Sequence, residues 1–189
     1  MERTYVVLKN QIFQKDQFKI VPIRDMDQLD IMQWRNEQIY HLRQNKTLTS
    51  SDQKNYFSNV VAHLFQQEKP QQILFSYLEG DKCIGYGGLV HINWVDQHAE
   101  ISFIMNTELE QQYFTFHWST YLKLIEAVAF QELNLHKIYT YAFDLRMKLY
   151  KVLEENNFSK EARLIDHAKF ENRFVDVLIH SKFNESFKF

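Results

Sequence analysis

The sequence has little cysteine, glycine or proline: one cysteine (Cys83), four glycines and two prolines in 189 residues. A single cysteine excludes a disulfide framework and a zinc site made of cysteines. The chain also lacks a basic excess, with a formal net charge of −2, so we expect no nucleic acid as a partner. No apolar run reaches about 18 residues, and the first four residues do not begin a signal peptide. These absences predict a cytoplasmic protein without a membrane span.

Aromatic residues are instead abundant, with 16 phenylalanines and 10 tyrosines, and 45% of the chain is hydrophobic. This composition is typical of a globular chain with a substantial core. Because no repeat, linker or low-complexity tract interrupts the sequence, we predict one domain over residues 1–189. The eight histidines show no spacing typical of metal ligands, so no metal site is expected.

Hydrophobic periodicity and turn residues predict a mixture of strands and helices. The expected strands cover residues 4–8, 18–23, 73–78, 84–90, 99–105, 137–143, 162–167 and 174–181. The expected helices run from 25 to 38, from 51 or 52 to 65, from 118 to 133 and from 147 to 156. The polar segments 66–72 and 107–112 are typical of loops. This order predicts an α/β or α+β architecture in which the helix before residue 137 joins two neighbouring parallel strands.

A series of motifs, taken in order, resembles GNAT-superfamily N-acyltransferases over nearly the whole chain. They are WRNEQ followed by LRQ (34–38 and 42–44), IGYGGL (84–89), AEISF (99–103), FQELNLHKIY (130–139) and VLEENNF (152–158). The last two resemble RimL-like members, and the first resembles the branch that acylates amino sugars carried on nucleotides. The resemblance implies the GNAT fold, a central mixed and mostly antiparallel sheet that is splayed in the middle and flanked by helices.

For function, the resemblance implies direct transfer of an acyl group from a coenzyme A thioester to an amine, with no metal. It favours a nucleotide-linked amino sugar as the acceptor, for example a dTDP-linked 3-amino-3,6-dideoxyhexose used in surface polysaccharide biosynthesis. The acyl group is acetyl or a longer short-chain acyl such as 3-hydroxybutyryl. A protein N-terminal acetyltransferase and a non-catalytic GNAT binding module stay open as alternatives. So does a homodimer that forms through Phe183, Phe187 and Phe189.

Direct transfer needs a group that takes the amine proton and a group that protonates the leaving thiolate. In the implied fold, Glu100 lies on a strand that lines the cleft and His91 ends the strand before it, so either is a candidate base. Tyr150, in the last helix, is the candidate acid, one turn before Leu153, where the family often has its tyrosine. Pairing within the sheet, an edge position and core packing are the alternative roles of these three candidates.

The expected coenzyme A site departs from the family pattern. The usual Gln/Arg-x-x-Gly-x-Gly/Ala loop is replaced by a segment without glycine, at the place where helix N–H groups would meet phosphate. Arg146 stands where the family has an asparagine that contacts the cofactor. The resemblance assigns the cofactor to Phe103, Ile104, Met105, Tyr113, Thr115, Ser119 and Arg146.

The acceptor side is assigned to the WRN motif and the residues that follow it. Arginine followed by asparagine suits the recognition of phosphate and hydroxyl groups, and an aromatic ring can stack on a base or a sugar. The residues of this predicted site are Trp34, Arg35, Asn36, Gln38, Arg43 and Gln44. For Trp34, anchoring its own helix is the alternative role.

Overall fold

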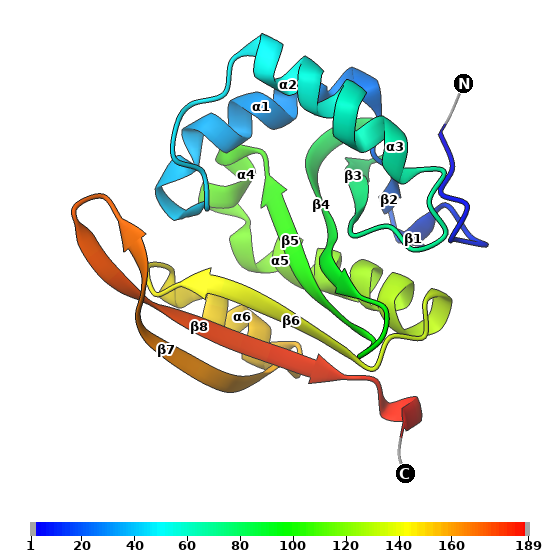
Figure 1. The fold of residues 1–189 in the computed structure, drawn as a ribbon. Helices are drawn as coiled ribbons and strands as arrows, with labels where there is room; N and C mark the ends of the chain where they lie inside the picture. Colours follow the sequence, from blue (N-terminus) through cyan, green and yellow to red (C-terminus); the bar gives the residue numbers. More distant parts are fainter. Residues whose placement is uncertain (1–2, 188–189) are drawn as a thin grey trace.

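The computed structural model describes residues 3–187 and contains one sheet with helices on both faces (Figure 1). The strands are β1 (Phe13–Lys15), β2 (Phe18–Pro22), β3 (Ile73–Glu79), β4 (Lys82–Asn93), β5 (His98–Met105), β6 (Lys137–Phe143), β7 (Ser159–Phe170) and β8 (Arg173–Phe183). The helices are α1 (Gln28–Glu37), α2 (Ser50–Tyr56), α3 (Ala62–Leu64), α4 (Thr107–Gln112), α5 (Phe114–Glu126) and α6 (Met147–Glu155). π-Helical turns extend α2 over Phe57–Val61 into α3 and extend α5 over Ala127–Glu132.

The sheet splits in its middle. Its strand order is β1-β2-β3-β4-β5-β6-β8-β7, and all neighbours are antiparallel except β5 and β6. These two strands pair over three residues only, with Glu100 and Tyr139 as the last pair. Past this point β5 stays beside β4 and β6 stays beside β8, so the two halves of the sheet diverge. The predicted sheet, mixed, mostly antiparallel, splayed and flanked by helices, is confirmed.

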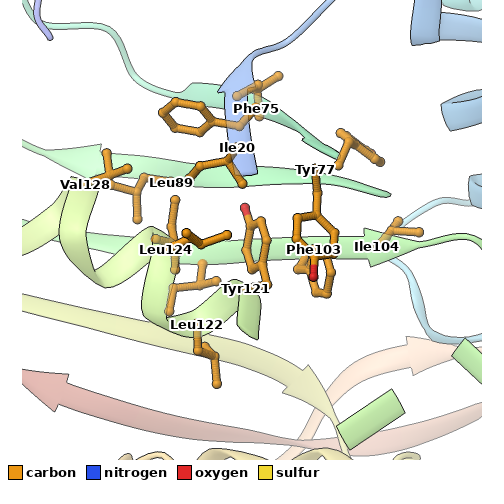
Figure 2. Close-up of a cluster of buried hydrophobic side chains, with 14 of the residues drawn as sticks. Ile20, Phe75, Tyr77, Leu89, Phe103, Ile104, Tyr121, Leu122, Leu124 and Val128 are labelled. Carbon is orange, nitrogen blue, oxygen red and sulfur yellow. The ribbon is translucent and has the colours of Figure 1, made fainter. Parts of the chain in front are cut away.

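Helices α1 and α2 cover one face of the sheet, and α5 and α6 cover the other (Figure 1). The contact with α5 explains one glycine of the IGYGGL motif. A Cβ on Gly87 would lie 2.1 Å from the carbonyl oxygen of Ser102 and 2.5 Å from the hydroxyl of Tyr121. Tyr121 in turn stacks on Phe103, with ring centroids 3.9 Å apart (Figure 2). Gly87 therefore lets the α5 tyrosine lie directly on the sheet beside the split.

The strand expected at residues 4–8 does not form. The segment instead packs across β3: the Tyr5 hydroxyl donates to the Leu74 carbonyl at 2.9 Å and accepts from the Leu74 N–H at 3.0 Å. The edge strand on this side is β1, which pairs with β2. The buried Tyr5 hydroxyl thus bonds to both backbone groups of Leu74, just beyond the residues of β3 that pair with β2.

The segment expected as a loop at residues 107–112 is helix α4. Asn106 caps this helix, because its side-chain oxygen accepts from the N–H groups of Glu108 and Leu109 at 2.9 and 3.4 Å. Helix α5 follows at once and begins at Phe114, four residues earlier than expected. The place of the glycine loop is thus taken by a capped helical turn.

Candidate active site

The split between β5 and β6 opens a cavity of about 730 Å³. Its walls come from α1, α2, β4, β5, β6 and the start of α6. Residues 101–104 of β5 and 140–143 of β6 line it and do not pair with each other. Within residues 3–187, their backbone groups on this side have no strand partner, so an extended ligand with amide groups can bond to them.

Glu100 lies at the point where the two strands part. Its carboxylate is buried, is ion-paired with Arg43 and has the His91 Nε2 atom 3.9 Å away. Burial raises the pKa of Glu100 above its usual range, and Arg43 and His91 oppose this shift. His91 lies at a bulge of β4 with a positive φ of 50°, and its side chain is mostly exposed. The structure therefore brings the two candidate bases together at the cavity.

Arg35 projects from α1 into the cavity and is held by two neutral groups. Its Nε donates to the Gln44 side-chain oxygen at 2.9 Å, and its Nη1 donates to the Tyr86 hydroxyl at 2.5 Å. The Gln44 amide is held in turn by Asn36 at 3.1 Å. Among the ion pairs of the described residues, none involves Arg35. A cation therefore faces the cavity without a carboxylate partner.

The other residues expected on the acceptor side hold the wall together. Asn36 bonds to both backbone groups of Leu48, at 2.8 and 2.9 Å. The Gln38 amide donates to the Met105 carbonyl at 2.7 Å, which ties the end of α1 to β5. Trp34 is 5% exposed and belongs to the core, so its ring does not face a ligand. Its anchoring role is the one that the structure supports.

Arg43, also expected on the acceptor side, is ion-paired with the candidate base. Its guanidinium pairs with Glu100 and lies 4.6 Å from the ring centre of Tyr141. Its side chain stays 45% exposed. Arg43 thus sets the charge around Glu100, while Arg35 faces the cavity with its own charge unmatched.

Arg146, the third arginine of the cavity wall, lies at the start of α6 and is ion-paired with a carboxylate. Its Nη2 is 2.8 Å from Glu110 of α4, and Lys148 is 3.2 Å from the same carboxylate. His41 lies 3.2 Å from the Arg146 Nη1 atom. Burial and the nearby Arg146 charge lower the pKa of His41 to about 3, so this histidine is neutral. The guanidinium of Arg146 also lies 5.0 Å from the ring centre of Phe114.

Comparison with known proteins places this arrangement in a family. A family model described as an acetyltransferase (GNAT) domain matches residues 19–179. The chain belongs to the GNAT acetyltransferase family. A structure of spermidine N-acetyltransferase from Vibrio cholerae in complex with CoA and spermine shares its fold, with a TM-score of 0.79 at 19% identity over 90% of this chain and 97% of that one.

Further solved structures share the GNAT fold at similar distance. Mutant forms of the spermidine/spermine N-acetyltransferase of Vibrio cholerae give a TM-score of 0.76 at 22% identity, over 92% of this chain and 97% of that one. A probable acetyltransferase gives 0.74 at 17% identity, over 93% and 98%. As a GNAT member the chain is an acyl-CoA-dependent N-acyltransferase, and acyl-CoA is its donor substrate, as the motifs indicated.

The unpaired edges of β5 and β6 fit the amide-bearing arm of an acyl-CoA. Phe103 and Ile104, two of the expected cofactor residues, line the cavity here. Met105 is 1% exposed, and only its carbonyl is engaged, by Gln38. The donor arm would therefore be held by β5 up to Ile104 rather than by the Met105 side chain.

The phosphate end of the GNAT donor site is built differently from the family pattern. Tyr113 and Thr115 are exposed at the start of α5, where no side chain caps the helix, so N–H groups there can meet a phosphate. Ser119 instead lies deeper in the helix, and its hydroxyl accepts from Asn156 at 2.9 Å. Arg146, the remaining candidate, is already paired with Glu110.

Tyr150, the expected proton donor, does not reach the cavity. Its hydroxyl bonds to the Phe143 carbonyl at 3.2 Å and to Asp144 at 3.1 Å, and its ring stacks on His180 with centroids 5.2 Å apart. It lines a separate hollow beside β8. Cys83 is also unsuited to chemistry, because burial raises the pKa of its thiol to about 12. The structure thus supports direct transfer without a cysteine intermediate.

Four residues at the cavity or its donor end went unrecognised in the sequence: Tyr86, His41, Glu110 and Lys148. Tyr86 lies inside the IGYGGL motif, and the alternation of the strand could have placed it on the face opposite Gly87. The other three belong to segments whose approach depends on tertiary packing. No local pattern would have found them.

The sequence led us to expect neither a metal site nor a membrane span. Within residues 3–187, no group of histidine, cysteine or carboxylate side chains has an arrangement suited to a metal ion. No helix in that range is long and apolar enough to cross a bilayer.

Phe183 and Phe187, two residues of the expected dimer contact, pack around His136, with ring centroids 5.3 and 5.4 Å away. Phe189, the third, lies outside the described residues. The homodimer stays a prediction.

Proposed function

We propose that this GNAT enzyme transfers an acetyl or longer short-chain acyl group from acyl-CoA to the amino group of a nucleotide-linked amino sugar. The observation that carries the proposal is Arg35, a cation that faces the cavity without a carboxylate partner among the described residues. A buried or half-buried charge is costly unless it is matched. The diphosphate of a sugar nucleotide supplies the missing negative charge. The proposal includes a role in surface polysaccharide biosynthesis in the cytoplasm.

The charges of the cavity favour this acceptor over a polyamine. Three arginines line the walls, Arg35, Arg43 and Arg146. The Glu100 carboxylate is already paired with Arg43. The remaining acid of the wall, Asp52, is engaged in capping α2 through Thr49. A polyamine would therefore meet an unmatched cation where it needs carboxylates, although the solved structures of similar fold include spermidine acetyltransferases.

In the proposed reaction the amine nitrogen attacks the thioester carbonyl, a C–N bond forms and the C–S bond breaks. Glu100 takes the proton that the amine loses, directly or through His91, which lies 3.9 Å from its carboxylate. Burial raises the pKa of Glu100 toward that of a base that works near neutral pH, and Arg43 opposes this shift by favouring the ionised carboxylate. The thiolate takes its proton from water, since Tyr150 lies outside the cavity.

The test is a thiol-release assay on the full chain with acetyl-CoA and 3-hydroxybutyryl-CoA. The acceptors are a dTDP-linked 3-amino-3,6-dideoxyhexose, the same amino sugar without its nucleotide, spermidine, and a peptide with a free N-terminus. We expect the nucleotide-linked sugar to give the highest kcat/KM. Preference for spermidine or the peptide would overturn the acceptor assignment. No release from any acceptor, with acyl-CoA still bound, would favour a non-catalytic binding module.

Two variants separate binding from chemistry in this assay. Arg35→Met should raise the KM for the nucleotide-linked sugar by roughly tenfold to a hundredfold and leave the KM for acyl-CoA within about twofold. Glu100→Gln should lower kcat by about 10²–10⁴-fold with little change in either KM. If Arg35→Met instead raises the KM for acyl-CoA and leaves the KM for the sugar unchanged, Arg35 belongs to the donor site and the acceptor binds elsewhere in the cavity.

A further inference from the structure

Tyr86 is a buried residue of β4 that lines the cavity and is 6% exposed. Its hydroxyl accepts a hydrogen bond from the Arg35 Nη1 atom at 2.5 Å. An arginine can only donate, so this contact uses an oxygen lone pair and leaves the phenolic hydrogen unused. Within residues 3–187, no group accepts a hydrogen bond from this hydroxyl. The Tyr86 O–H is therefore a donor available to a ligand in the cavity.

Arg35 has further donors at the same place. A guanidinium carries five N–H groups, and two are used, one on Gln44 and one on Tyr86. The other N–H groups and the Tyr86 O–H are all donors, and one of the two residues is charged. Such a group suits an oxyanion with several oxygens, and its one acceptor atom, the Tyr86 oxygen, is already bonded to Arg35. Its chemistry selects phosphate, diphosphate or carboxylate.

The donors are also held in place before a ligand arrives. Gln44 fixes the Arg35 Nε, Asn36 fixes Gln44, and the backbone of Leu48 fixes Asn36. Tyr86 is fixed within β4, between β3 and β5. A rigid set of donors loses little conformational entropy on binding, which is a feature of anion sites that discriminate well.

We propose that Arg35 and Tyr86 together form the site for one anionic group of the acceptor, with Arg35 supplying the charge and Tyr86 a neutral O–H. The inference rests on the proposed function and names the residue pair that would select a phosphorylated acceptor. The anion could also belong to the donor, because acyl-CoA carries phosphates. The acceptor is favoured because Arg35 projects from α1 and bonds to Gln44 and Tyr86, whereas the cations Arg146 and Lys148 lie against Phe114, at the start of α5.

The direct test uses isothermal titration calorimetry on the full chain, with thymidine diphosphate and coenzyme A as separate probes. Tyr86→Phe keeps the ring and removes only the hydroxyl. It should weaken thymidine diphosphate binding by roughly tenfold to a hundredfold and leave coenzyme A binding unchanged. Tyr40→Phe, the same change at an exposed tyrosine outside the cavity, is the control and should alter neither. Thermal unfolding of each variant checks that the fold is kept.

Steady-state kinetics supply a readout that a structural role would not move. Tyr86→Phe should raise the KM for the nucleotide-linked sugar and leave kcat within about twofold. With the amino sugar that lacks a nucleotide, wild type and variant should have the same KM. In the Arg35→Lys and Tyr86→Phe double variant, the two losses should fall short of additive, because both residues hold one anion.

Three results would overturn this site. Weaker coenzyme A binding in Tyr86→Phe, with thymidine diphosphate unaffected, would assign the anion to the donor. Unchanged binding of both probes would show that the hydroxyl meets no anion. A fall in kcat with constant KM would make Tyr86 a proton-transfer group instead. If thymidine diphosphate binding depends on Tyr86 but no amino sugar is acylated, the site stands and the proposed function fails.

Discussion

Arg35 and Arg146 both line the cavity, and their surroundings differ in one decisive way. Arg146 has the Glu110 carboxylate 2.8 Å away, whereas Arg35 is held by the neutral groups of Gln44 and Tyr86. A matched arginine is satisfied within the fold, and an unmatched one keeps its charge for something that enters the cavity. Arg146 therefore mainly holds the structure together, and Arg35 is the better candidate for the recognition of a ligand.

The largest expected effect comes from removing the carboxylate that is paired with Arg146. Glu110→Gln leaves the buried Arg146 without its carboxylate, and should lower the free energy of unfolding by about 3–5 kcal/mol. Urea unfolding followed by tryptophan fluorescence measures this. Arg35→Met, at the unmatched arginine, should cost no more than about 1 kcal/mol, because the loss of two hydrogen bonds to neutral groups is offset by the removal of a charge that has no carboxylate partner. Equal losses in the two variants would contradict the distinction.

Much of the fold around the cavity could be predicted, because its periodicity is strong and local. The buried strand at 99–105 and the apolar stripe of the helix before residue 137 both correspond to real elements. Residues 4–8 misled because apolar residues in a short run are typical of a strand, and the tertiary contact of Tyr5 with β3 cannot be seen in that run. The helix at α4 was missed because its polar composition is typical of a loop.

The candidate site was predictable only where the resemblance names a strand that lines the cleft. Glu100 was proposed as a base because it lies on that strand, and it does line the cavity. Tyr150 was misplaced because the face that α6 turns toward β8 is set by packing, here by its stack on His180. Tyr86 was not recognised because its proposed role depends on a hydrogen bond from Arg35. The two residues are 51 positions apart in the sequence and come together only in the folded chain.

A second prediction concerns His41, the neutral neighbour of Arg146. Its pKa is about 3 in the folded protein, below the usual 6.5, so the unfolded chain binds a proton between these pH values and the folded chain does not. Stability should therefore fall as the pH drops below 6.5, by up to about 2 kcal/mol at pH 5 from His41. Burial also lowers the pKa values of His117 and His180, so these histidines add to the loss of stability at low pH.

The His41→Gln variant isolates one contribution to this pH dependence. Urea unfolding at several pH values between 7 and 5 should give a flatter fall of stability than in wild type, because the unfolded chain has one proton fewer to gain. His63→Gln, at an exposed histidine of the short helix α3, is the matched control for the loss of a histidine. An unchanged slope in His41→Gln would mean that His41 is not held neutral beside Arg146.

The smallest expected effect concerns Arg43. Like Arg146 it is paired with a carboxylate, that of Glu100, but its own side chain is about half exposed. Burial raises the pKa of Glu100 and Arg43 opposes this, so Arg43→Gln should raise that pKa further. A base must be deprotonated to act, so the acid limb of the kcat profile should move to higher pH. Measurements with both substrates saturating keep binding effects out of the profile. Arg43→Lys keeps the charge and should leave the limb near its wild-type position. If Arg43→Gln does not move the limb, Glu100 is not the proton acceptor, and the profile of a His91→Gln variant then decides whether the histidine takes that role.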